Sequence, residues 1–156
     1  MPVLSLPSAQ ALVDRERRAG KRIVFTNGVY DILHPGHVRY LAAARAEGDV
    51  LVVGVNSDRS VRAIKGPSRP INPENERAEI LAALACVDVA VVFDEDTPAD
   101  IIKAIQPDVL VKGADWAENA IVGRDTVEAR GGRVVRMPIE EGWSTTGILG
   151  RTRRAE

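Results

Sequence analysis

One stretch decides the fold: residues 22–37, which read RIVFTNGVYDILHPGH. It starts with an apolar run at 22–26, and a run of this length without polar alternation predicts a strand covered on both faces. A turn containing Gly28 follows, and Pro35 marks the start of a helix. A strand that leads through such a turn into a helix is the repeating unit of an open α/β sheet, where ligands bind at the carboxyl ends of the strands. We therefore expect this turn to border a ligand site.

The alternation of strand and helix continues along the rest of the chain. Glycine, proline and capping residues separate the apolar runs, and residues 65–73 are long enough to predict a functional loop. The fold class predicted is α/β, with a Rossmann-like open parallel five-stranded sheet and helices on both faces. We expect residues 1–156 to form a single domain. Further strands are predicted at 50–55, 89–93, 109–112 and 133–137, and helices at 8–20, 35–47, 72–84, from 97, at 123–130 and from 144.

Composition excludes several classes of protein. Hydrophobic residues at 45% and charged residues at 28% are ordinary for a globular chain, and the net charge of −1 gives no electrostatic reason to bind nucleic acid or a membrane surface. Cys86 is the only cysteine, which excludes an intramolecular disulfide, and its apolar neighbours predict a core position. The apolar runs are too short to span a bilayer and the N-terminus lacks signal-peptide features, so the expected location is cytoplasmic.

The turn itself has the features of a phosphate site. Gly28 and Gly36 allow a ligand to approach the backbone closely, and Pro35 sets up a helix start whose free N–H groups face an anion. His34 and His37 are three residues apart, so both rings reach the same side of that helix start. Each ring donates to phosphate oxygens as imidazole, and more strongly as imidazolium.

Two other interpretations of the histidines stay open at this point. They could be capping or buried histidines beside a glycine-rich turn, or they could hold zinc. A zinc pair needs a third ligand and no nearby candidate stands out, so we expect no metal held mainly by these histidines. A dehydrogenase-type site is disfavoured because no Gly-x-Gly-x-x-Gly follows the first strand.

The motif formed by residues 27–31 and 34–37 resembles the HxGH nucleotidyltransferase superfamily, in its cytidylyltransferase-like branch. From about residue 8 to 151 the chain is similar to the D-glycero-β-D-manno-heptose 1-phosphate adenylyltransferases. The segments that carry this likeness are 65–72, 76–81, 94–98, 108–115 and 142–146.

The resemblance implies an enzyme that transfers AMP from ATP to a sugar 1-phosphate, giving an ADP-sugar and pyrophosphate for ADP-heptose and lipopolysaccharide core synthesis. It implies Mg²⁺ carried by the triphosphate, and a homodimer or higher homo-oligomer. No nucleic-acid or membrane partner is expected.

The resemblance also implies roles for particular residues. Catalytic roles fall to His34, His37 and Lys65, and contacts with the acceptor substrate to Arg69 and Lys112. Nucleotide contacts are implied for Asn27, Gly28, Val29, Tyr30, Asp31, His34, Gly36, His37, Lys65, Arg77, Lys112, Gly113, Asp115, Gly142, Trp143, Ser144, Thr145 and Thr146.

The residues themselves leave some of these roles open. Ser144 could be an ordinary N-cap, and Arg77 could form a surface ion pair with its acidic neighbours. Asp31 could simply be a turn residue. Either Trp143 or Trp116 could stack on a base or merely cover the core.

The identity of the nucleotide rests on one difference. The cytidylyltransferases that resemble this chain have Arg-Thr-Glu-Gly where residues 139–142 read Ile-Glu-Glu-Gly, and the loss of that arginine favours ATP over CTP. Lys65, Arg69 or Lys112 is expected to supply the missing positive charge. The alternatives are a cytidylyltransferase of the glycerol-3-phosphate type, an FMN adenylyltransferase and, in a different class, a non-catalytic nucleotide-binding regulator.

Overall fold

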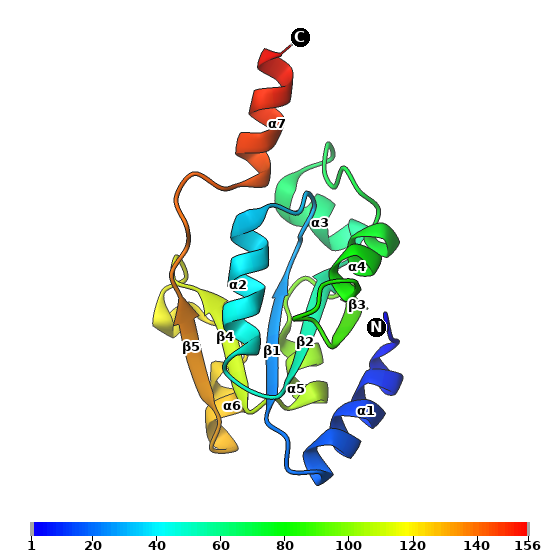
Figure 1. Ribbon diagram of the computed structural model, residues 1–156, viewed down its shortest axis with the longest axis vertical. Helices are drawn as coiled ribbons and strands as arrows, with labels where there is room; N and C mark the ends of the chain where they lie inside the picture. Colours follow the sequence, from blue (N-terminus) through cyan, green and yellow to red (C-terminus); the bar gives the residue numbers. More distant parts are fainter. Residues whose placement is uncertain (1, 156) are drawn as a thin grey trace.

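The computed structural model describes residues 2–155 and contains one sheet of five parallel strands in the order β3-β2-β1-β4-β5 (Figure 1). The predicted α/β class and the all-parallel sheet are therefore confirmed. The strand bounds lie within two residues of the predicted ones: β1 (Ile23–Gly28), β2 (Val50–Asn56), β3 (Val89–Phe93), β4 (Val109–Gly113) and β5 (Arg133–Met137).

Helices connect the strands in the order that the parallel sheet requires. The long α1 precedes β1, and the rest lie in the crossovers or after β5. None of the described helices is long and apolar enough to cross a membrane. The bounds are α1 (Leu6–Arg18), α2 (Pro35–Arg45), α3 (Asp58–Lys65), α4 (Glu74–Ala82), α5 (Ala99–Ile105), η1, a 3₁₀ turn (Glu118–Ala120), α6 (Arg124–Ala129) and α7 (Thr145–Arg154).

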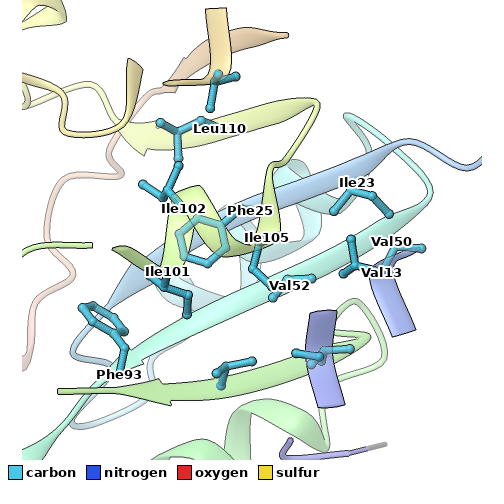
Figure 2. Close-up of a cluster of buried hydrophobic side chains, with 14 of the residues drawn as sticks. Val13, Ile23, Phe25, Val50, Val52, Phe93, Ile101, Ile102, Ile105 and Leu110 are labelled. Carbon is cyan, nitrogen blue, oxygen red and sulfur yellow. The ribbon is translucent and has the colours of Figure 1, made fainter. Parts of the chain in front are cut away.

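The sheet is covered on both faces, as its apolar strands predict. On one face α1, α5 and α6 pack against the strands, and Figure 2 shows Val13 and the three isoleucines of α5 meeting Phe25 and Val52. On the other face α2 and α4 supply Leu41 and Leu81. Alternate residues of each strand enter opposite clusters, because side chains alternate across a strand.

The order of the strands places the phosphate-type turn at a crevice. The chain moves from β1 outward to β2 and β3, then returns to β4 on the other side of β1. Connections leaving β1 and β4 therefore diverge at their carboxyl ends, which is where open α/β sheets bind ligands. The predicted turn after β1 lies at this switch point.

Several details differ from the prediction. Helix α3 occupies part of a segment where no helix was expected, although Ser57 caps it by accepting from the Ser60 N–H at 3.1 Å. The first helix is capped by Ser5 rather than Ser8. Strand β5 is an edge strand whose residues are only partly buried or exposed, although Val134 and Val135 pack against opposite core clusters. Cys86 is only partly buried against the core.

Candidate functional site

A cavity of about 520 Å³ opens at the switch point, at the carboxyl ends of β1, β4 and β5. Its walls come from the turn after β1, the start of α2, the end of α3 with the following loop, and the segment that leads into α7. Figure 1 shows α7 extending beyond the body of the sheet, above α2. The cavity thus gathers segments from both halves of the chain.

The two histidines lie together in the wall of this cavity. Their rings stack with centroids 3.7 Å apart and an interplanar angle of 16°. His34 is the N-cap of α2, and its Nδ1 accepts the His37 backbone N–H at 3.3 Å. Because Nδ1 is the acceptor, a neutral His34 ring carries its proton on Nε2 and offers that N–H as a donor.

Both rings are held in the neutral form. Burial lowers the pKa of His34 below its ordinary value. Burial, followed by the charge of the adjacent His34 ring, lowers the pKa of His37 to about 4. Two imidazolium ions in stacking contact would repel strongly, and this repulsion also lowers the pKa values of the pair. At neutral pH the site therefore offers imidazole donors rather than imidazolium cations.

Packing around His37 explains two features of the turn. Tyr30 has a left-handed backbone with φ of 50° and packs edge-on against His37, with ring centroids 5.2 Å apart. A Cβ at Gly28 would come within 2.9 Å of the Tyr30 ring. Gly28 is therefore needed to let Tyr30 lie against His37, and Nδ1 of His37 is buried without a partner among the described residues.

The starts of α2 and α7 meet at Gly36. A Cβ at Gly36 would lie 3.0 Å from the Cβ of Trp143 and equally close to the His34 ring. Trp143 is nearly parallel to His34, with ring centroids 6.0 Å apart. The two helix starts are therefore adjacent, well within the length of a nucleotide.

Helix α7 offers amides at this junction. Ser144 is its N-cap, and the Ser144 hydroxyl accepts the Gly147 N–H at 2.9 Å. Within residues 2–155, the backbone N–H groups of Thr145 and Thr146 have no recorded acceptor. Ser144 is thus an ordinary cap through its side chain, and the anion-binding capacity lies in the following amides.

The predicted loop after α3 is fastened to the turn after β1. The Asp31 carboxylate, 2% exposed, accepts from Arg69 Nε at 2.8 Å and from the N–H groups of Ile71 and Asn72 at 2.9 Å. Burial alone would raise the pKa of Asp31, but these backbone N–H groups and then Arg69 hold it below its usual value. The carboxylate is fully occupied, so the predicted nucleotide contact of Asp31 is replaced by a role in anchoring the loop.

Arg77 also differs from its prediction. It is buried outside the cavity wall, where its guanidinium donates to Val29 O at 2.7 Å, Asn72 O at 2.9 Å and Asp58 Oδ1 at 2.9 Å. All three nitrogens are satisfied by protein atoms. Arg77 therefore ties the turn after β1 and the loop after α3 to the first residue of α3, and its guanidinium nitrogens are engaged by the protein rather than free for the predicted nucleotide contact.

Lys112 is not among the residues that line the cavity. Its side chain is buried and donates to Asn27 Oδ1, across neighbouring strands β4 and β1. With that oxygen engaged, the amide of Asn27 turns its NH₂ group away from Lys112. Burial lowers the pKa of Lys112 to about 8. Direct contact between Lys112 and a substrate is not supported by this position.

Most of the predicted site residues do line the cavity. Arg77, Lys112 and Gly142 do not, and neither does Trp116, which is half exposed. The residues that line it as predicted are Asn27, Gly28, Val29, Tyr30, Asp31, His34, Gly36, His37, Lys65, Arg69, Gly113, Asp115, Trp143, Ser144, Thr145 and Thr146. Those that sequence reasoning missed are Arg39, Tyr40, Ala43, Met137, Pro138, Ile139 and Glu140.

The missed residues share a simple cause. Arg39, Tyr40 and Ala43 recur along α2 at helical spacing, so they lie on the face that continues from Gly36. Both carboxylate oxygens of Glu140 accept from Arg39 at 2.8 Å, which joins α2 to the segment after β5. That segment lies beside α2 only because β5 is the outer neighbour of β4.

Comparison with known families agrees with this geometry. The sequence profile of the family described as "Cytidylyltransferase-like" matches residues 25–150, which include both helix starts and every strand except the first residues of β1. The chain belongs to the cytidylyltransferase-like family. The predicted membership of the nucleotidyltransferase superfamily is thereby confirmed.

Curated relatives of this cytidylyltransferase-like chain are named "Bifunctional protein HldE". The protein of Syntrophotalea carbinolica is 55% identical over 92% of this chain, and that of Geotalea uraniireducens is 53% identical over 97%. The chain spans only 29% and 31% of the length of these two relatives.

Solved structures resemble this cytidylyltransferase-like fold. The lipopolysaccharide core biosynthesis protein from Thermoplasma volcanium is 30% identical with a TM-score of 0.64, and the match covers 78% of this chain and 98% of that one. Pantothenate synthetase from Thermus thermophilus, 19% identical, has a TM-score of 0.66 over 99% of this chain and 70% of its own. The second likeness concerns the fold alone.

Proposed function

We propose that this chain transfers AMP from ATP to a sugar 1-phosphate, with D-glycero-β-D-manno-heptose 1-phosphate as the expected acceptor. The observation that carries the proposal is the convergence of a neutral histidine pair and two helix starts on one cavity at the switch point of the sheet. The high identity to proteins named HldE and the likeness to a lipopolysaccharide core biosynthesis protein support the sugar nucleotide product. A cytoplasmic location, where ATP is available, is part of this proposal.

In the proposed reaction an oxygen of the sugar phosphate attacks the α-phosphorus of ATP. A new P–O bond forms to the sugar phosphate, the bond between the α- and β-phosphates breaks, and pyrophosphate leaves. The second pKa of a phosphate monoester is near ~6, so the nucleophile is already mostly dianionic at neutral pH and needs no general base. This agrees with a cavity whose histidines are neutral and, because their pKa values are lowered, only weak bases.

The chain's contribution is to position the phosphates and to stabilise their charge. His34 would donate from Nε2 to a phosphate oxygen, and the free amides of Thr145 and Thr146 would bind the triphosphate from the opposite helix start. Lys65, which lines the cavity, would supply a positive charge near the departing pyrophosphate. Such preorganised donors act most strongly where charge develops in the transition state.

Mg²⁺ fits this site as a partner of the triphosphate. Within the described part of the chain, no cluster of three or more His, Cys, Asp or Glu side chains could hold a metal ion. Of the cavity carboxylates, Asp31 is occupied by its three donors and Glu140 by Arg39, which leaves Asp115 as a ligand. The ion would neutralise phosphate charge, with most of its ligands coming from phosphates and water.

A coupled pyrophosphate assay tests the proposal. ATP and CTP are each offered with a panel of sugar 1-phosphates, glycerol 3-phosphate and FMN. We expect release of pyrophosphate with ATP and a manno-heptose 1-phosphate, at a rate at least tenfold above any other pair. Release with CTP and glycerol 3-phosphate would support the cytidylyltransferase alternative. ATP binding without turnover on any acceptor would support the regulator, and the homo-oligomer stays a prediction for sedimentation analysis.

A further inference from the structure

The loop that follows α3 is held by one carboxylate. Three groups of residues 69–72 donate to the Asp31 carboxylate, and Asn72 Nδ2 donates to the Asp31 carbonyl at 2.7 Å. Asp31 itself belongs to the turn between β1 and α2 and has no exposed side-chain surface. The loop therefore folds back onto the same turn that supplies the histidines.

Arg69 is bound to Asp31 through one nitrogen only. Nε donates to Asp31 Oδ2 at 2.8 Å, and within residues 2–155 neither Nη atom has a recorded hydrogen bond. Neither Nη atom is among the fully buried atoms that lack a partner, and Arg69 lines the cavity. The side chain is 13% exposed, so it is confined while its two Nη groups remain accessible from the cavity.

This arrangement suits a phosphate ligand. A guanidinium binds phosphate through paired N–H groups, and it loses less conformational freedom on binding when it is already held in place. Asp31 offsets the charge of Arg69, so the pair contributes directed hydrogen-bond donors to the cavity wall more than it contributes net positive charge. Lys65 then provides the net charge of this wall.

We propose that Asp31 is a positioning residue that holds Arg69 in the cavity wall, where the Arg69 Nη groups bind a substrate phosphate. The inference rests on the proposed function, because it takes the cavity to be a phosphate-transfer site. The phosphate could belong to ATP or to the sugar phosphate, and the two KM values separate these sources.

The test is a double-mutant cycle of Asp31→Asn and Arg69→Ala on kcat/KM for each substrate. Loss of one charge-assisted hydrogen bond predicts a decrease of roughly 10–100-fold in each single variant. If Asp31 acts through Arg69, the double variant is within about threefold of the worse single variant. A double variant that loses the product of the two single effects would overturn the proposal.

A matched control comes from Asp88, at the opposite edge of the sheet. Its carboxylate accepts the Leu51 N–H at 2.8 Å and pairs with Arg45 Nε at 3.0 Å, the same chemistry outside the cavity. Asp88→Asn should lower the melting temperature while leaving kcat/KM within about twofold of wild type. If Asp31→Asn behaves like this control, the role of Asp31 is only structural and the proposal is wrong.

Two further measurements keep the inference testable. If Asp31→Asn fails to fold, Arg69→Lys takes its place: lysine keeps the charge but cannot donate to Asp31 and a phosphate through separate nitrogens, so its activity should fall near that of Arg69→Ala. Near wild-type activity would overturn the proposal. If the wild type releases no pyrophosphate with any acceptor, the proposed function fails, and the positioning role is tested by calorimetric affinities for ATP and for the sugar 1-phosphate. Weaker binding of either ligand in both single variants then supports positioning, and unchanged binding of both ligands overturns it.

Discussion

Replacing Arg77 by methionine should destabilise the protein far more than a surface arginine would. The Arg77 side chain is completely buried, and it donates to two backbone carbonyls and to Asp58, whose side chain is 29% exposed. Methionine keeps the apolar stem and much of the volume, so the change removes the hydrogen bonds without opening a large cavity.

The loss of stability can be worked out from the groups that the change leaves without a hydrogen-bond donor. Each buried carbonyl that loses its donor costs about 1–3 kcal/mol, whereas water can solvate the partly exposed Asp58. We therefore expect a loss of about 3–5 kcal/mol, typical of removing one partner from a buried ion pair. For a chain of this size, that corresponds to a decrease in melting temperature of roughly 6–20 °C.

Thermal unfolding followed by circular dichroism measures this loss, with urea unfolding as a second determination. The control is Arg59→Met, because Arg59 is 51% exposed and pairs with Asp94 and Asp96 on the surface. That control should lie within about 3 °C of wild type. If Arg77→Met also melts within 3 °C of wild type and instead loses ATP affinity, the structural role assigned to Arg77 is refuted.

Three other predictions concern the site. His37→Ala should lower kcat for pyrophosphate release by ~10²–10³, the range for one preorganised donor, and turnover within threefold of wild type would contradict its role. His37 has a pKa of about 4 in the fold and a higher one when unfolded, so the unfolded chain binds more protons between these values. The free energy of unfolding should therefore be constant above pH ~6.5 and fall as the pH is lowered toward 4. The slope of this fall should be smaller in His37→Gln, and equal slopes in the two proteins would count against burial of the neutral ring. Gly28→Ala would place a Cβ 2.9 Å from the Tyr30 ring, and we expect a loss of stability of about 1–3 kcal/mol together with lower kcat, whereas unchanged melting and turnover would show that the ring can move freely.

The sheet could be predicted because the sequence patterns that mark its strands each lie within a few consecutive residues. Strands β1 to β4 each begin with a continuous apolar run of three or more residues, because their side chains enter both core clusters and polar alternation would bury polar groups. Helix α3 was not predicted because it is short and ends at Lys65, where the segment interpreted as a loop begins. The exposure of β5 was likewise not visible, since its apolar residues do not reveal that it is an edge strand.

The part of the site that could be predicted lies on one short segment, which contains both histidines and the start of a helix. The spacing of His34 and His37 predicts that their rings lie together, and Pro35 predicts the N-terminus of α2. Arg77 and Asp31 were assigned to the nucleotide because a charged residue near a motif looks the same whether its partner is a ligand or the protein. Their partners, such as Val29 O and Arg69, lie 48 and 38 residues away along the chain.

The sequence alone thus determined the strand–turn–helix unit, the parallel sheet and the histidine pair, since periodicity, capping and close spacing act within a few residues. Only the tertiary structure decided which polar groups face the cavity and which are consumed by other protein groups. The reason is physical: a buried charge must find a partner, and which partner it finds depends on strand order and loop packing rather than on its neighbours in sequence.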